Sequence, residues 1–171
     1  MGEDEILMLQ SNDGRIVTVP KSVALLSETI GQALESASRT DMTPIPLFQV
    51  NYNTLKKLVA WMVRHAQINP SKDCQSGEEE GKHDGKASCI LDWEREEFDS
   101  MDRNELFALM NAANYLGVSP LSRSSAAFVA EKLQTMSVED AREYLSLVDD
   151  FTDEERDKIR QETLWTEKRC L

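Results

Sequence analysis

One polar stretch most limits how this chain can fold. Residues 69–89 read NPSKDCQSGEEEGKHDGKASC, with three glycines, three consecutive glutamates and almost no apolar side chain. Such a segment buries too little apolar surface to offset the conformational entropy that it would lose on ordering. We therefore predict a long disordered loop at about residues 69–91, with ordered structure before and after it.

The residues before this loop predict a small β-sheet with helices. EILMLQ and RIVTVP are apolar, extended segments, and SNDG between them favours a tight hairpin turn. TPIPLFQV predicts a short edge strand, since proline cannot donate to a neighbouring strand. Residues 22–36 predict two short helices or one bent helix around Gly31, and residues 53–66 predict an amphipathic helix capped by Asn51 or Asn53. The apolar face of that helix holds Leu55, Leu58, Val59 and Met62.

Four helices are predicted after the loop, each with its own start signal. Asp102 opens a capping box, and Gly117 suits the C-terminal cap of the same helix. The next helix begins at Ser119, and the last two begin at the capping residues Ser137 and Thr152. The expected apolar stripes are Leu106, Leu109, Met110, Ala113 and Leu116 in the first of these helices and Ala126, Val129, Ala130 and Leu133 in the second.

The charge of the chain argues against two broad classes of partner. Asp and Glu outnumber Lys and Arg by 31 to 19, and the formal net charge is −12. Such a surface repels nucleic-acid phosphates and anionic lipid heads, so we expect neither a nucleic acid nor a membrane as partner. The acidic start MGEDEILMLQ is unlike a signal peptide, and an odd number of cysteines, three, suits a reducing compartment. These features favour the cytoplasm and nucleus.

The sequence contains no recognisable catalytic motif. It lacks a glycine-rich phosphate loop, a GxSxG nucleophile motif and an HExxH metal motif. His65, Cys74, His83 and Cys89 are too widely spaced for a zinc site, whose ligands usually pair about two to four residues apart. We expect no enzymatic activity, no metal and no cofactor.

The segment LFALMNAANYLGV, residues 106–118, leaves two interpretations open. Asn111, Asn114 and Tyr115 lie off the apolar stripe of this helix, and Phe107 lies beside them at helical spacing. Amide and phenol groups next to apolar side chains are typical of a surface that contacts a partner. The same residues would also suit a helix end that caps itself and covers the edge of a core.

Four motifs, in this order along the chain, resemble one known family. They are LQSNDGRIVTV, IPLFQVNYNTLKKLVAWMVRH, LFALMNAANYLGV and DDFTDEERDKIRQETLW. Together they resemble the S-phase-kinase-associated (Skp) adaptor family, whose members link cullins to F-box proteins in SCF-type ubiquitin ligases. The resemblance implies an α+β fold. A BTB/POZ-like module, residues 1–118, would precede a helical extension that binds F-box proteins, residues 119–171.

The resemblance also assigns residues to each partner. Asn114 and Tyr115 match the family's cullin-contacting pair. Positions in or near the F-box groove are matched by Leu121, Ala126, Val129, Leu133, Leu147 and Trp165. The last helix supports this assignment independently, because it is polar on nearly every face and has few apolar residues, Ile159 and Trp165 among them. The alternative is that Trp165 folds back onto its own lobe.

Three departures from the family pattern lie in the C-terminal part. Ser122 stands where the family has a second leucine, Val138 where it has a proline, and Leu145, Ser146 and Leu147 where it has Phe-Asn-Ile. They indicate a divergent member with an altered range of F-box partners. We expect a non-enzymatic adaptor that is a monomer or weak dimer when free. The alternative is a self-associating BTB-type scaffold without F-box partners.

Overall fold

The computed structural model describes residues 5–36, 43–68, 90–148 and 150–167. The side chains of residues 36, 160 and 162–167 are not part of this description. The chain forms two compact units, residues 1–132 and 133–171.

The predicted loop at about 69–91 lies outside the described residues, except at its C-terminal end. Ile90 is buried, and the Leu91 N–H donates to Glu94 Oε2 across 3.0 Å. Ile90 and Leu91, which the prediction placed in the loop, are therefore held by a buried side chain and a helix-capping hydrogen bond.

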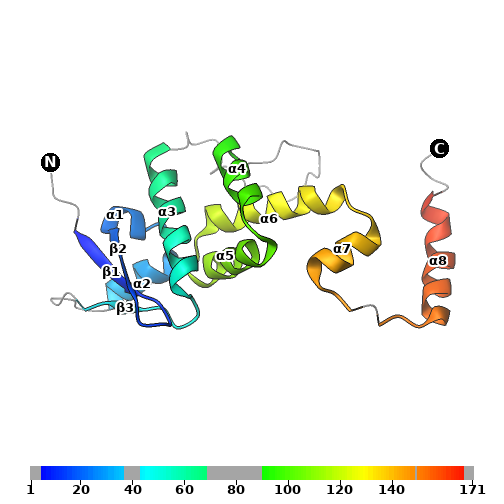
Figure 1. Ribbon diagram of the computed structural model, residues 1–171, viewed down its shortest axis with the longest axis horizontal. Coiled ribbons are helices and arrows are strands. Elements are labelled where there is room, and N and C mark those ends of the chain that lie inside the picture. The colour runs from blue at the N-terminus through cyan, green and yellow to red at the C-terminus, as the bar shows by residue number, and fades with distance from the viewer. Residues whose placement is uncertain (1–4, 37–42, 69–89, 149, 168–171) are drawn as a thin grey trace. The chain divides into compact units, whose positions relative to one another are not determined.

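The first unit contains a three-stranded sheet with the strand order β2-β1-β3 (Figure 1). Strands β1 (Ile6–Gln10) and β2 (Ile16–Pro20) form the predicted antiparallel hairpin, with Leu9 opposite Val17. Strand β3 (Ile45–Pro46) runs parallel to β1 at the edge of the sheet, where a proline is tolerated. The prediction of an edge strand with prolines is confirmed.

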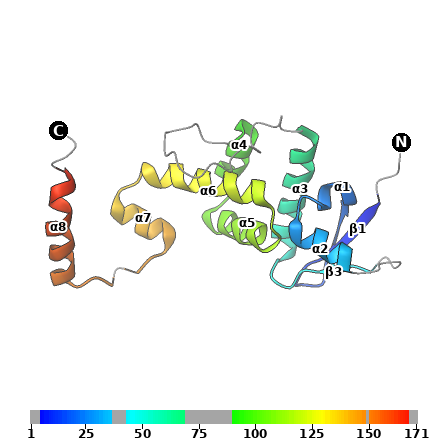
Figure 2. The same ribbon diagram turned by 180° about the vertical axis from the view of Figure 1, so that it is seen from behind.

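Helices surround this sheet and continue beyond it. The first unit holds α1 (Lys21–Ala24), α2 (Glu28–Ser36), α3 (Tyr52–Ile68), α4 (Asp92–Ser100), α5 (Arg103–Tyr115) and most of α6 (Ser119–Gln134). The second unit holds α7 (Val138–Leu145) and α8 (Asp153–Glu167). Both views show α3 between the sheet on one side and α4 and α5 on the other (Figures 1 and 2). The predicted α+β class, with a helical C-terminal region, is confirmed.

The predicted apolar faces of α3 and α5 form the core of the first unit. The buried residues of the α3 face are Leu55, Leu58, Val59 and Met62. The buried residues of the α5 face are Leu106, Leu109, Ala113 and Leu116, whereas Met110 is partly exposed. Because α3 packs against both α5 and β2, this core joins the helices to the sheet.

The stripe predicted for α6 is largely wrong. Val129 is buried, but Ala126 and Ala130 are exposed and Leu133 is partly exposed. The residues that are buried together with Val129 are Leu121, Ser124, Ser125 and Phe128. The hydroxyls of both serines donate to the Leu121 carbonyl, across 3.3 and 2.6 Å, so two polar residues can be buried on a helix without losing a hydrogen bond.

An aromatic and acidic cluster around the buried Trp61 and Glu94 joins α3 to α4. The Trp61 ring stacks on His65 with ring centres 4.5 Å apart, and its centre lies 6.0 Å from that of Trp93. Glu94 is only 2% exposed, and burial is the main cause that raises the pKa of its carboxyl. The Trp61 indole N–H helps to lower that pKa, although it completes no hydrogen bond of normal geometry within the described structure.

The C-terminal end of α5 is fixed against the N-terminal end of α2. The Thr29 N–H donates to the Leu116 carbonyl across 3.3 Å, and the Ser27 hydroxyl donates to the same carbonyl. The Thr29 hydroxyl donates to the Tyr115 carbonyl across 3.1 Å. The last carbonyls of one helix and the first N–H groups of another have no partners within their own helices, so here they satisfy each other.

We predict that Gly117→Ala weakens this contact. Gly117 has φ +64°, and a β-carbon added there would lie 3.1 Å from Glu28 Cβ. Left-handed backbone strain and this close approach should together lower the free energy of unfolding by about 1–2 kcal/mol, measured by urea denaturation.

Gly14→Ala is the matched control, because Gly14 has φ +79° but no described atom within 4 Å of the added β-carbon. It should lose only the strain component, about 1 kcal/mol. If the two variants lost equal free energy of unfolding, the close approach of α2 to Gly117 would contribute nothing to the cost of the substitution.

We predict that Glu94→Gln stabilises the protein at neutral pH. A carboxyl whose pKa is raised on folding contributes stability below its unfolded pKa and loses that contribution as the pH rises through its folded pKa. Glutamine keeps an acceptor for the Leu91 N–H without a buried charge, so its melting temperature should exceed that of wild type at pH 7 by a few degrees. The difference should shrink as the pH approaches 4. Glu96→Gln, an exposed neighbour, should change little, and a less stable Glu94→Gln at pH 7 would contradict the argument.

Candidate partner-binding surfaces

The predicted cullin-binding pair lies on the exposed face of α5. Asn114 is exposed and Tyr115 is partly exposed, and both lie off the buried stripe, as expected. Asn111, one turn earlier, is also exposed. The contact between α5 and α2 fixes the backbone beneath this pair, since the Tyr115 carbonyl accepts the Thr29 hydroxyl. The assignment of Asn114 and Tyr115 to a cullin stays a prediction.

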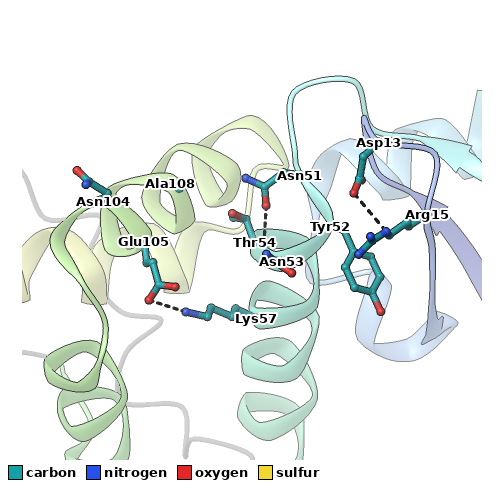
Figure 3. Close-up of a pocket in the computed structure, with 10 residues that line it drawn as sticks. All are labelled: Asp13, Arg15, Asn51, Tyr52, Asn53, Thr54, Lys57, Asn104, Glu105 and Ala108. Atoms are coloured by element: carbon teal, nitrogen blue, oxygen red, sulfur yellow. Dashed lines mark hydrogen bonds and ion pairs between the residues drawn. The ribbon is translucent and has the colours of Figure 1, made fainter.

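A polar pocket of about 430 Å³ opens between the hairpin turn, the start of α3 and the start of α5 (Figure 3). It is lined by Asp13, Arg15, Asn51, Tyr52, Asn53, Thr54, Lys57, Asn104, Glu105 and Ala108. Asn51 Oδ1 accepts the Thr54 N–H across 2.8 Å, so Asn51 rather than Asn53 caps α3. No motif predicted this pocket, because its lining comes from three segments that are separated in the sequence.

The charged groups of this pocket are paired with one another. Lys57 Nζ lies 2.8 Å from Glu105 Oε2, and Arg15 Nε lies 3.6 Å from Asp13 Oδ2 (Figure 3). The hydrogen bond from Lys57 is the main cause that lowers the pKa of Glu105, and the hydroxyl of Ser11 does the same for the pKa of Asp13. Both carboxylates are therefore ionised at neutral pH, and the pocket offers amide groups rather than an excess of charge.

The pocket and Tyr115 of the predicted cullin pair share one face of α5, and Asn114 lies beside that face. Asn104 and Ala108 line the pocket, and Asn111 and Tyr115 follow at the spacing i, i+4, i+7, i+11. Residues at this spacing form a row along one side of a helix. The row was visible in the sequence, but without the structure nothing distinguished it from an ordinary solvated face.

The predicted F-box residues on α6 differ in their exposure. Leu121 and Val129 are buried, at 0% and 7%, so they pack within the first unit and leave little surface for a partner. Ala126 is exposed and Leu133 is partly exposed. Of these four residues, only Ala126 and Leu133 have exposed side-chain surface that a partner could touch directly.

The described side chains of the second unit are all exposed or partly exposed. This holds for residues 133–148, 150–159 and 161. Leu147 and Ile159, both predicted to contact an F-box, are 59% and 45% exposed, whereas the side chain of Trp165 on α8 is outside the described part. Short helices that bury no apolar side chain gain little from their own packing. The described apolar side chains of the second unit are therefore accessible at its surface rather than packed in a core.

At the end of α5 the Gly117 N–H donates to the Asn114 carbonyl across 3.1 Å, and the Val118 N–H donates to the Ala113 carbonyl across 2.8 Å. The end of α7 repeats this pattern with a serine in place of the glycine. Ser146 N–H donates to the Glu143 carbonyl across 3.0 Å, and Leu147 N–H donates to the Arg142 carbonyl across 2.9 Å. Ser146 has φ +55°, in the left-handed region that Gly117 occupies at the end of α5. A side chain in this conformation costs roughly 1–2 kcal/mol. This strained position falls in one of the three departures from the family pattern.

The described residues offer neither a metal site nor a membrane-spanning helix. Among the residues that the structure describes, no three His, Cys, Asp or Glu side chains are grouped so that they could hold a metal ion. His65 is described and stacks on Trp61, whereas Cys74, His83 and Cys89 lie outside the described residues. The described helices are all too short or too polar to cross a membrane.

Comparison with known proteins identifies the family. The model of the Skp1 family tetramerisation domain matches residues 5–67, and that of the Skp1 family dimerisation domain matches residues 119–166. The chain is 34% identical over 161 residues to the E3 ubiquitin ligase complex SCF subunit sconC of Talaromyces marneffei, covering 94% of this chain and 96% of the relative. It is 33% identical over 165 residues to Suppressor of kinetochore protein 1 of Schizosaccharomyces pombe, covering 95% and 98%. It is 32% identical over 166 residues to a Skp1-related protein of Caenorhabditis elegans, covering 94% and 91%. Because these matches extend over both compact units, the chain belongs to the Skp1 family.

Proposed function

We propose that this protein is the adaptor subunit of an SCF-type E3 ubiquitin ligase, joining a cullin to F-box substrate receptors. The observation that carries the proposal is the contrast between the two units. The first has its own core and an exposed polar face on α5, whereas no described side chain of the second is buried. A relative of nearly the same length is an SCF subunit, which supports the same conclusion.

The proposed mechanism is positional rather than catalytic. By binding a cullin on α5 and an F-box protein on the C-terminal helices, the adaptor holds the substrate near the ubiquitin-transfer machinery. Tethering raises the effective concentration of the substrate at that machinery without any new chemical group. The polar pocket agrees with a non-enzymatic role, because the pKa values of its carboxyls Asp13 and Glu105 are lowered, which does not suit a general acid or base near neutral pH. We place this work in the cytoplasm and nucleus.

Each partner is assigned to a different surface. The cullin contacts Asn114 and Tyr115 and the row that leads from Tyr115 to the polar pocket. The F-box protein contacts Ala126 and Leu133 on α6 and the apolar residues of α7 and α8. The departures at Ser122, Val138 and Leu145–Leu147 lie in the second of these surfaces, so they alter the choice of F-box protein rather than of cullin.

A self-associating BTB-type scaffold is the alternative function, and the SCF-subunit relatives do not favour it. Sedimentation of the purified chain separates the two ideas. An adaptor should be a monomer or weak dimer that forms a 1:1 complex with an F-box domain. A stable oligomer that ignores F-box domains would support the scaffold.

We predict that Asn114→Lys combined with Tyr115→Lys abolishes cullin binding. Each lysine would place a charge where an amide or a phenol docks, and a desolvated, unpaired charge should weaken binding by about 100-fold or more in calorimetry with a recombinant cullin N-terminal domain. F-box binding should be unchanged. Glu96→Lys on α4, which makes the same change in net charge at another exposed position, is the control and should bind both partners normally.

We predict that truncation after Phe151 weakens F-box binding and leaves cullin binding intact. The apolar residues of α8 are too few to hold it to a core, so its removal should barely alter the urea midpoint of the first unit. F-box binding should fall severely, while cullin binding persists. Loss of both partners in the truncated protein, or of neither, would contradict the division of labour between the two units.

A further inference from the structure

We propose that the polar pocket at the start of α3 and α5 binds an uncharged carboxamide, the side chain of an asparagine or glutamine on the cullin. Thr54 and Asn51 on α3 and Asn104 on α5 would hold this group. The inference rests on the proposed function, since it adds a second contact to the surface assigned to the cullin.

The wall of the pocket contains a buried hydroxyl that the fold leaves unpaired. Thr54 lies in the first turn of α3 and is only 9% exposed. Its N–H donates to Asn51 Oδ1 across 2.8 Å, but its hydroxyl forms no hydrogen bond with any residue that the structure describes. Figure 3 shows this hydroxyl on the side of α3 that faces Asn104 and Ala108. Buried polar side chains are normally paired, so this one is available to a group that enters the pocket.

Two amides lie near this hydroxyl. Because the Thr54 N–H fixes Asn51 Oδ1, the Nδ2 group of Asn51 turns the other way, and Figure 3 shows it on the side that faces α5. Asn104 reaches the pocket from the first turn of α5, and both asparagines are exposed. The pocket thus offers hydrogen-bond donors and acceptors together. A carboxamide is itself both donor and acceptor, so it can match this pattern.

The charges around the pocket disfavour an ionised ligand. The Ser11 hydroxyl is the main cause that lowers the pKa of Asp13, and the Tyr52 N–H at the start of α3 lowers it further. At the start of α5, Asp102 Oδ2 accepts the Asn104 N–H across 3.2 Å. An added anion would therefore meet carboxylates already placed at both helix starts, and an added cation would meet the two paired cations of the pocket. An uncharged polar group can enter without disturbing either pair.

The cullin is the partner placed to supply this group. Asn104 and Ala108 belong to the row that continues to Asn111 and Tyr115. The eleven positions from Asn104 to Tyr115 span about 16 Å of helix. A standard interface covers about 800 Å² on each partner, which is roughly 30 Å across. A cullin docked at Tyr115 is therefore wide enough to cover the pocket as well.

The decisive variant is Thr54→Val, which keeps the shape of the side chain and removes the hydroxyl. Calorimetry with a recombinant cullin N-terminal domain should show binding weakened by about fivefold or more. The loss should be the same at low and high salt, because the partner group is uncharged. The melting temperature of the free variant should be no lower than that of wild type, since the hydroxyl has no partner in the described chain. A purely structural role would instead lower the melting temperature and leave cullin binding unchanged.

Two further variants and a second partner serve as controls. Thr18→Val removes an exposed hydroxyl on β2, outside the pocket, and should bind the cullin as wild type does. Thr54→Ser keeps the hydroxyl and should bind the cullin more tightly than Thr54→Val. F-box domains should bind Thr54→Val and wild type equally. Weaker F-box binding with normal cullin binding would assign the pocket to the other partner and overturn the inference.

Substitutions on the cullin identify the bound group. Each asparagine and glutamine on its docking face would be replaced by alanine in turn. One of these changes should weaken binding to wild type by about fivefold but not weaken binding to Thr54→Val, as a double-mutant cycle shows for groups in contact. Coupling of Thr54 only to charged cullin residues, or equal binding by Thr54→Val and wild type, would overturn the inference and leave the adaptor function standing. Failure of the cullin to bind the wild-type chain would overturn the adaptor function itself.

Discussion

The mutual satisfaction of two helix ends is the interaction on which the first unit depends. The carbonyls that end α5 and the N–H groups that begin α2 would each need water or a side chain if they were separated. Their pairing fixes the direction in which α5 leaves the core, and with it the row from Asn104 to Tyr115. Because backbone hydrogen bonds position this row, its side chains take no part in holding α5 in place. They can therefore be substituted to suit a partner without loss of the fold.

The helices of the second unit depend on local capping rather than on contacts between distant segments. Its helices are started by strong local signals, such as Ser137 accepting the Asp140 N–H and Thr152 accepting the Glu155 N–H. Local capping sets where a helix begins, but it contributes only about 1 kcal/mol for each cap. The described part of this unit has no buried apolar face. We interpret its exposed apolar side chains as the surface that an F-box protein covers.

The sequence was most informative where one physical rule acted alone. The hairpin, the caps at Asn51, Asp102 and Ser137, and the apolar faces of α3 and α5 all follow from local geometry and periodicity. Prediction failed on α6, where hydropathy favoured alanines over Ser124 and Ser125. A serine can be buried once its hydroxyl bonds to a carbonyl one turn earlier, and hydropathy does not represent that bond.

Two further features could not be read from the sequence, because they depend on contacts between distant segments. The polar pocket needs the hairpin turn, α3 and α5 to meet. Glu94 is buried because it bonds to Leu91 at the start of α4 and faces Trp61 on α3. The partner residues themselves came from resemblance to a family, since an exposed asparagine and tyrosine look the same whether or not a partner covers them.

The left-handed serine at the end of α7 has a consequence for the life of the protein in the cell. Ser146 ends a helix that has no core behind it, so the backbone there opens at little energetic cost. Proteases cut where a chain opens locally, and an occupied binding surface suppresses such opening. Copies without a receptor would be degraded first, and the amount of adaptor in the cell would then follow the supply of its partners.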